Sequence, residues 1–238
     1  MENFRNRIYN MDCIAGMKML PDRCVDLVLT DLPYGTTSGC WDVLLPLDQL
    51  WKELHRVAKP DAAMVFTAAQ PFTTTLIQSN PKEFRYCWYW IKNQVTGFPF
   101  CKFQPLRCVE EIAVFYRKAP TYNPQGLVAL EHPRRNRGKH YTDRSVYRRD
   151  GLSRTTLQHY TNYPRQVLTI PCQREGLHPT QKPVALFEYL VRTYTDPGQL
   201  VLDCCMGSGT TEVACRNAGR DWVGFELDPL YFETAQAR

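Results

Sequence analysis

Four consecutive residues, Asp31-Leu32-Pro33-Tyr34, bring together a carboxylate, backbone carbonyls and an aromatic ring directly after the apolar run Val25–Thr30. The run predicts a buried parallel strand, and open α/β sheets bind ligands at the carboxyl ends of such strands. Asp31 and the Leu32 carbonyl can accept both protons of an exocyclic amino group while Tyr34 stacks on the attached ring, which suits a nucleobase. The alternative is a structural turn in which Asp31 precedes a rigid proline and Tyr34 only packs.

A second group of candidate residues lies in the stretch LVLDCCMGSGTTEVACRNAGRDWVGFELD. Gly207 and Gly209 fall between a predicted strand and a predicted helix, where missing side chains let the backbone approach a ligand. Glu226 follows Gly207 by 19 positions, a spacing at which a carboxylate can accept hydrogen bonds from ribose hydroxyls. The alternative is a tight turn without a ligand. Neither a complete G-x-G-x-x-G nor a G-x-x-x-x-G-K-[ST] is present, which disfavours pyrophosphate and nucleoside triphosphates.

Positive charge is concentrated in one segment. The chain has 29 Lys+Arg and 24 Asp+Glu, but ten of the basic residues and only three acids fall between Glu131 and Arg174. Arginine forks bind phosphates and guanine edges, and the interleaved tyrosines favour nucleic acid; a solvated charged face is the alternative. The residues predicted to bind DNA are Arg134, Arg135, Arg137, Lys139, Arg144, Arg148, Arg149 and Arg154.

The surrounding pattern predicts the elements that position these groups. Apolar residues recur at helical spacing from Leu47 to Val57, and a strand at 62–67 follows, so the first half contains a strand–helix–strand unit with a right-handed crossover. Segments 84–92 and 111–117 predict strands that pair antiparallel at a sheet edge. Pro183 begins a helix, and a strand at 200–203, a helix and a strand at 222–225 form a second such unit.

The same pattern divides the chain into three parts. Residues 1–119 are predicted as a catalytic half and residues 172–238 as a ligand-binding half of one α/β domain. Between them, in residues 120–171, apolar periodicity fades and Pro, Asn, Arg and Tyr dominate, which indicates an inserted binding segment or, as the alternative, a mobile loop region.

Composition excludes several classes. The 238 residues are 44% hydrophobic and 22% charged, as in an ordinary globular protein. No apolar run approaches the roughly 20 residues of a membrane span, and the first residues lack the apolar core of a signal peptide, so a cytoplasmic protein without membrane contact is expected. The ten cysteines include no C-x-x-C pair, so no metal site is predicted.

Three motifs resemble those of the DNA amino-methyltransferases, which use S-adenosylmethionine to methylate adenine N6 or cytosine N4. DLPY at Asp31–Tyr34 resembles their catalytic motif, DCCMGSGTT at Asp203–Thr211 their cofactor loop, and HPTQKP at His178–Pro183 a motif that precedes that loop. The order, with the catalytic motif first, is similar to the permuted beta group. The resemblance implies an α/β, Rossmann-like methyltransferase fold with a mostly parallel sheet, an antiparallel edge hairpin, circularly permuted motif order and an inserted target-recognition segment.

The resemblance also implies roles for individual residues. Asp31, Leu32, Pro33 and Tyr34 would be catalytic; the residues implied to bind S-adenosylmethionine are Asp12, Thr180, Lys182, Asp203, Cys204, Cys205, Gly207, Ser208, Gly209, Thr210 and Glu226. Permutation further implies that the strand at 7–11 lies beside the strand at 222–225. Two positions depart from the family pattern. Leu32 replaces a proline but keeps the carbonyl, and Cys204-Cys205 replace Pro-Phe, so the aromatic contact that the family makes with the cofactor is absent or supplied elsewhere.

The resulting expectation is a site-specific methyltransferase that flips an adenine out of double-stranded DNA and methylates its N6 atom. Adenine is favoured because the motif opens with Asp, whereas cytosine enzymes of the family more often open with Ser. N4-cytosine methylation, RNA adenine methylation and a noncatalytic DNA-binding regulator with a decayed fold are the alternatives. A bacterial or phage restriction-modification setting is implied, with a separate restriction endonuclease as a possible partner and both monomer and homodimer open.

Overall fold

A computed structural model describes residues 4–37, 39, 42–136, 156–173, 176–177 and 180–238 of the chain. These residues form two compact units, a larger one of Met1–Asn123 with Gln166–Arg238 and a smaller one of Pro124–Arg165. No helix among the described residues is long and apolar enough to cross a membrane.

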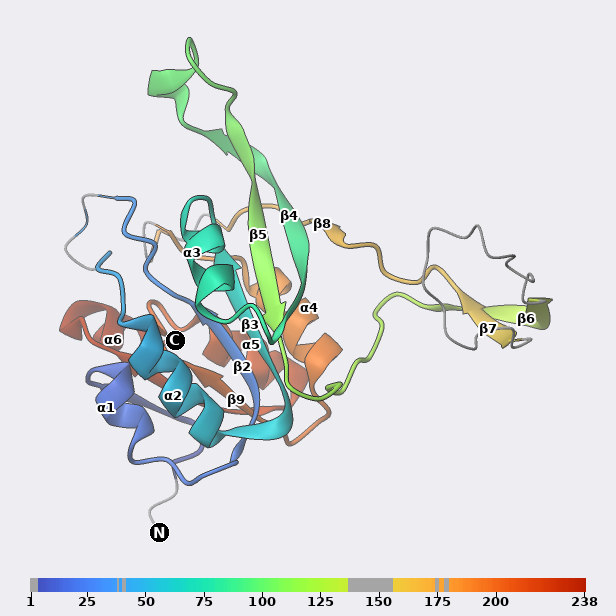
Figure 1. The fold of residues 1–238 in the computed structure, drawn as a ribbon, viewed down its shortest axis with the longest axis horizontal. Helices are drawn as coiled ribbons and strands as arrows, with labels where there is room; N and C mark the ends of the chain where they lie inside the picture. The colour runs from blue at the N-terminus through green and yellow to red at the C-terminus, as the bar shows by residue number, and fades with distance from the viewer. Residues whose placement is uncertain (1–3, 38, 40–41, 137–155, 174–175, 178–179) are drawn as a thin grey trace. The chain divides into compact units, whose positions relative to one another are not determined.

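The larger unit is an α/β domain built on one eight-stranded sheet (Figure 1). Its strands are β1 (Arg7–Asn10), β2 (Val25–Asp31), β3 (Ala58–Ala68), β4 (Phe84–Thr96), β5 (Arg107–Phe115), β8 (Val167–Thr169), β9 (Leu200–Asp203) and β10 (Asp221–Glu226). Its helices are α1 (Cys13–Met17), α2 (Leu47–Val57), α3 (Phe72–Ser79), η1 (Phe98–Phe100, a 3-10 helix), α4 (Val184–Tyr194), α5 (Thr210–Ala218) and α6 (Pro229–Gln236).

The strand order is β1-β10-β9-β2-β3-β5-β4-β8. From β2 the chain proceeds through α2 to β3 on one side, and from β9 it proceeds through α5 to β10 on the other, so the order reverses between the neighbouring strands β2 and β9. Such a switch point opens a crevice at the carboxyl ends of the strands. Asp31 ends β2 and Asp203 ends β9, so the two predicted motifs meet there.

Two apolar layers cover the sheet. Helices α1, α2 and α3 pack on one face around Phe66 and Phe115, and helices α4, α5 and α6 pack on the other around Trp88 and Tyr194. Strands β2 and β9 supply buried residues to both layers, which explains their near-continuous apolar runs. The fold expected from the sequence, a mostly parallel sheet with antiparallel strands, is confirmed.

The permuted closure of the sheet is also confirmed. Strand β1 pairs in parallel with β10, with Arg7 opposite Val223 and Asn10 opposite Glu226. The side chain of Asn6 stabilises the pairing of β1 with β10, because its amide nitrogen donates to Asp221 and its oxygen accepts from the Trp222 backbone.

The antiparallel pair β4 and β5 differs from the sequence prediction in two ways. It is not the edge of the sheet, because β8 adds three residues in parallel to β4. It also extends to Thr96 and Arg107, several residues past the predicted ends. In the part of the chain that the structure describes, no helix packs against this extension, so its residues do not alternate between buried and exposed. Its sequence therefore lacks the alternation of apolar and polar residues that predicts a strand.

The smaller unit lies within the predicted insertion but is shorter than it. It contains β6 (Val128–Asn136) and β7 (Thr156–Thr161), which pair antiparallel. Residues 120–123 belong to the larger unit, where the Asn123 side chain donates to carbonyls at the end of α4. Residues 166–171 belong there as well, since they contain β8.

Candidate active site

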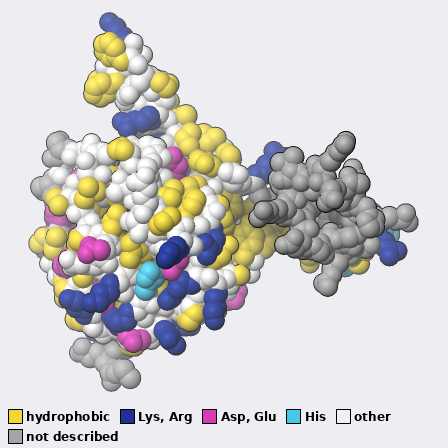
Figure 2. All heavy atoms as spheres, viewed as in Figure 1, with side chains coloured by type: hydrophobic (Ala, Val, Ile, Leu, Met, Phe, Trp, Pro, Cys, Tyr) yellow, Lys and Arg dark blue, Asp and Glu magenta, His cyan; other side chains and the backbone are white. Residues whose placement is uncertain are grey.

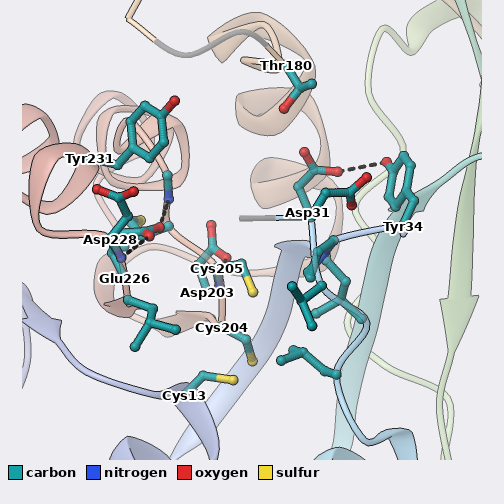
Figure 3. A pocket seen from close by; sticks show the side chains of 18 of the residues that line it. Cys13, Asp31, Tyr34, Thr180, Asp203, Cys204, Cys205, Glu226, Asp228 and Tyr231 are labelled. Atoms are coloured by element: carbon teal, nitrogen blue, oxygen red, sulfur yellow. Dashed lines mark hydrogen bonds between the residues drawn. The ribbon is translucent and has the colours of Figure 1, made fainter. Parts of the chain in front are cut away.

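A cavity of ≈ 510 Å³ opens at the switch point of the sheet, a volume within the range of small-molecule sites. Figure 3 shows Glu226, Asp228 and Tyr231 at one end of it and Asp31 and Tyr34 at the other, with Asp203 between them. The cavity therefore joins the two groups of residues that the sequence predicts as functional.

The Asp31 carboxylate is held by three donors. Its Oδ1 atom accepts from the hydroxyls of Tyr34, at 2.7 Å, and Thr67, and its Oδ2 atom accepts from Lys182 Nζ at 2.6 Å. A carboxylate has about four lone-pair sites. The contacts of the described residues thus leave one acceptor site of Asp31, on Oδ2, for a ligand in the cavity.

Lys182 lies between two carboxylates. Its side chain is 6% exposed, and its Nζ atom is 3.6 Å from Glu110 Oε2, while Glu110 Oε1 pairs with Lys92 at 2.8 Å. Burial lowers the pKa of Lys182, but the charges of Asp31 and Glu110 outweigh it and raise the pKa above its usual value. Lys182 is therefore a permanent cation that pairs with the Asp31 carboxylate.

Tyr34 and Leu32 fix the loop that follows β2. The Tyr34 ring stacks on Phe72, with ring centroids 5.3 Å apart, and burial together with the Asp31 charge raises the pKa of its hydroxyl well above the usual value. The hydroxyl thus remains a hydrogen-bond donor to Asp31. The Leu32 side chain is 3% exposed in the core, so leucine anchors the loop at the position where the family pattern has proline.

Asp42 organises the next turn of this loop. Its carboxylate accepts backbone hydrogen bonds of 2.7–2.8 Å from Gly35, Thr36 and Thr37. Burial opposes its ionisation, but these hydrogen bonds lower its pKa below the usual value. Asp42 was not among the site residues predicted from the sequence; the signal that points to it is a carboxylate five to seven positions after a Gly-Thr-Thr turn.

The loop after β9 is folded around a buried carboxylate. Asp203 is 2% exposed and accepts from the Thr211 hydroxyl and, at 3.0 Å, from the Cys205 backbone. Gly209 has φ +81°, and a Cβ there would approach Ala235 of α6 to 3.2 Å, so glycine permits both the turn and the contact between the loop and α6. Gly207 has φ +53° and faces the cavity.

Glu226 links this loop to the end of β10. Its two carboxylate oxygens accept from the backbone of Gly207, at 2.7 Å, and of Asp228, at 2.9 Å. Burial raises its pKa above the usual value. The carboxylate lines the cavity with acceptor capacity remaining, and its role in binding hydroxyl groups stays a prediction.

Asp203 makes the stability of the protein depend on pH. Burial raises its pKa from 3.8 to about 6, so the folded state binds this proton more tightly than the unfolded state, and the stability contributed by the group falls as pH rises from about 4 to 6. The loss is about 3 kcal/mol above pH 6. We expect Asp203→Asn to gain up to that amount relative to wild type between pH 4.5 and 7.5 in urea unfolding. Exposed Asp61→Asn is the control, and a pH-independent difference for Asp203→Asn would contradict the prediction.

Three thiols meet on the cavity wall. Cys13 lies at the start of α1, and Cys204 and Cys205 follow β9; Figure 3 shows their side chains close together. Hydrogen bonds from the Cys204 and Cys205 thiols lower the pKa of Cys13, while its proximity and burial raise theirs. Cys13 is therefore the most acidic thiol of the three, although the sequence did not single it out.

Most of the predicted site residues converge. Those that line the cavity are Asp12, Asp31, Leu32, Pro33, Tyr34, Thr180, Lys182, Asp203, Cys204, Cys205, Gly207, Ser208, Thr210 and Glu226. Gly209 does not line it and packs on α6 instead. The sequence missed Glu110 and Thr67; the signal for Glu110 is its phase with the buried Ile112 and Val114 of β5.

The predicted DNA-binding residues lie in or near the smaller unit. Arg134 and Arg135 are exposed on β6. The other predicted residues lie outside the described part of the chain: Arg137, Lys139, Arg144, Arg148, Arg149 and Arg154. Their predicted role stays a prediction.

The fold and the cavity define an α/β protein whose ligands meet at the switch point of its sheet. The family model described as DNA methylase matches residues 25–237, and the chain belongs to this family of N6 and N4 methyltransferases. It is 25% identical to the type II methyltransferase M1.MboII of Moraxella bovis, over 97% of this chain and 95% of that one. It is also 25% identical to the DNA adenine methyltransferase YhdJ of Escherichia coli, over 99% and 83%.

Solved structures agree on the fold. The structure titled PvuII DNA methyltransferase (cytosine-N4-specific) superposes with a TM-score of 0.68 at 19% identity, covering 96% of this chain and 84% of that one. The complex of M1.HpyAVI with SAM superposes with a TM-score of 0.64 at 24% identity, covering 98% of both chains.

Proposed function

We propose that this protein transfers a methyl group from S-adenosylmethionine to the N6 atom of an adenine flipped out of double-stranded DNA. The observation that carries the proposal is the Asp31 carboxylate, which is paired with Lys182 and faces the same cavity as the Asp203–Glu226 side. The carboxylates that we assign to the target amino group and to the cofactor ribose thus lie at opposite ends of one cavity (Figure 3).

The residues of the cavity fit the cofactor. Glu226 offers a carboxylate to ribose hydroxyls, and the backbone of the loop from Asp203 to Gly207 borders the same space. Asp12 lines it too, and its Oδ1 atom already caps α1 by accepting from the Ala15 backbone, which fixes the carboxylate for an adenine amino group. When bound, S-adenosylmethionine supplies a methyl group made electrophilic by the neighbouring sulfonium.

Asp31 and the Leu32 carbonyl then act on the target amino group. Its lone pair is delocalised into the base, and accepting its two hydrogens at these oxygens favours a pyramidal nitrogen whose lone pair points out of the plane of the ring. Because Lys182 holds the Asp31 carboxylate in place at 2.6 Å, this acceptor is present before the base arrives, and preorganised electrostatics of this kind supply much of the acceleration in enzymes. Tyr34 orients Asp31 through its hydroxyl.

Adenine is proposed over cytosine because the catalytic motif opens with Asp31. The relative from Escherichia coli is named as an adenine enzyme and the superposed PvuII structure as a cytosine enzyme, so the choice between the bases requires a direct measurement.

Purified protein is incubated with S-adenosylmethionine and unmethylated plasmid DNA, and the nucleosides are analysed by mass spectrometry. N6-methyladenine is expected. N4-methylcytosine would overturn the assignment of adenine as the target base. The absence of both methylated nucleosides would favour an RNA substrate or a noncatalytic regulator.

Cys13 reports cofactor binding without turnover. We expect iodoacetamide to alkylate Cys13 in the free protein, because its pKa is lowered and it lines the cavity, and S-adenosylhomocysteine to slow this reaction about tenfold or more at saturation. Exposed Cys101 serves as the internal control, since its labelling should not respond to the ligand. Peptide mass spectrometry measures both sites in one sample. Equal labelling of Cys13 with and without ligand would place the cofactor elsewhere.

A further inference from the structure

The end of the β4–β5 hairpin exposes three phenylalanines. Phe98 is 74% exposed, Phe100 is 55% and Phe103 is 86%. Their backbone is well bonded: Gly97, with φ +89°, starts the 3-10 helix η1, and the Phe100 carbonyl accepts from both Phe103 and Gln104. Large apolar side chains gathered on an ordered, exposed turn indicate a surface that meets a partner.

The hairpin points toward the side of the sheet that carries the active site. The strand registers place β4 Trp88 level with Asp31: Asp31 pairs with Thr67, Thr67 with Ile112, and Ile112 with Trp88. Strands β2, β3 and β4 run in the same direction, so β4 continues past Asp31 for the eight residues from Trp88 to Thr96. This length corresponds to roughly 25 Å at 3.3 Å per residue, which is far enough to reach along a duplex whose flipped base lies at Asp31.

The chemistry of the hairpin end favours nucleic acid. Residues 93–109 contain no Asp or Glu, while Lys102 and Arg107 are exposed. Figure 2 shows hydrophobic and basic side chains together on the projecting end. The positive charges suit phosphates, a two-stranded ribbon fits the major groove, and aromatic rings stack on bases or enter between base steps.

We propose that the end of this hairpin, residues 97–107, contacts the target DNA and that a phenylalanine from it fills the space left in the stack by the flipped base. Removing a base from the duplex costs a few kcal/mol of lost stacking, and an inserted aromatic ring restores part of it. The hairpin is thus a DNA-contacting element separate from the basic insertion. The inference rests on the proposed function, because it takes the ligand at Asp31 to be a flipped nucleotide.

The test compares the full-length Phe98→Ser/Phe103→Ser variant with wild type. Met19→Ser is the matched control, since Met19 is 54% exposed and lies between α1 and β2, before the amino end of that strand, whereas the hairpin extends past the carboxyl ends of the strands. Two 30-base-pair duplexes are used, one intact and one with a single abasic site, and Kd is measured by fluorescence anisotropy at fixed salt. Wild type and the Met19 variant are expected to prefer the abasic duplex. The double variant is expected to lose this preference and to bind about tenfold more weakly, with its Kd for S-adenosylhomocysteine unchanged.

The outcomes separate the hairpin from the proposed function. Unchanged DNA binding and preference in the double variant would overturn the hairpin proposal even if methylation proceeds. Unchanged DNA binding with conversion of a dimer to a monomer on size exclusion would assign the surface to a second copy of the chain instead. If the double variant loses the abasic preference but wild type methylates no nucleoside, the hairpin is retained as a DNA contact and the proposed reaction is retracted. Lys102→Glu, which leaves the phenylalanines in place, is expected to weaken binding to the intact and the abasic duplex by the same factor.

Discussion

Asp31→Asn is expected to lower the rate of methyl transfer on the order of 10³-fold. The amide keeps the shape of the side chain and an oxygen for Tyr34 and Thr67, but it loses the charge that draws the amino hydrogens of the target base. Lys182 retains Glu110 as a counter-ion, so the variant should fold. The rate is measured by transfer of tritiated methyl groups to plasmid DNA at saturating cofactor.

The matched control is Asp22→Asn. Asp22 is 72% exposed and pairs with Arg56 far from the cavity, so its removal should leave the rate within a factor of two. Protection of Cys13 by S-adenosylhomocysteine should be the same in the Asp31 variant as in wild type, which separates a chemical defect from a binding defect. A rate within tenfold of wild type for Asp31→Asn would remove Asp31 from the mechanism.

Lys182→Met is expected to reduce kcat on the order of 10²-fold at pH 7 by acting through Asp31. Without the buried cation, the Asp31 and Glu110 carboxylates lose the counter-ion that they share and repel each other. Asp31 is then no longer held in place to accept from the amino group. Steady-state kinetics at saturating cofactor measure the loss in kcat.

Two further variants keep the test decisive. Removal of one partner from a buried ion pair destabilises proteins by about 3–5 kcal/mol, so Lys182→Met/Glu110→Gln, which removes both charges, is measured beside the single variant and should regain part of the rate. Lys182→Arg, which keeps the cation, should keep kcat within about tenfold of wild type. If Lys182 instead binds the methionine end of the cofactor, Lys182→Met will raise KM for S-adenosylmethionine and leave kcat unchanged.

The sequence allows the main elements of the site to be predicted because they depend on local patterns. Strands β2 and β9 are nearly continuous apolar runs, and each ends in a carboxylate that the sequence predicts as functional, Asp31 or Asp203. Two such strands that belong to different strand–helix–strand units must meet at a switch point. The convergence of the two motifs in one cavity therefore follows from strand order alone.

The ion pairs of the site could not be predicted in the same way. Lys182 and Asp31 are 151 positions apart, and their contact depends on how the segment before α4 crosses the ends of β2 and β5. Short elements were missed for local reasons. Helix α3 contains three consecutive threonines, which have low helix propensity, and β8 has only three residues and exists because β4 offers a free edge.

The pairing of β1 with β10 has a consequence for the order in which the chain folds. Asn10 in β1 pairs with Glu226 in β10, which lies 216 positions later in the chain. Strands β2 and β3, in contrast, are joined by a short crossover and can associate as soon as both are synthesised. Contacts of such long sequence separation close slowly because a large loop must be ordered first. A nascent chain should thus form the loop after β2 early, whereas the join of β1 to β10, with Glu226 at its end, can form only after both strands have been synthesised.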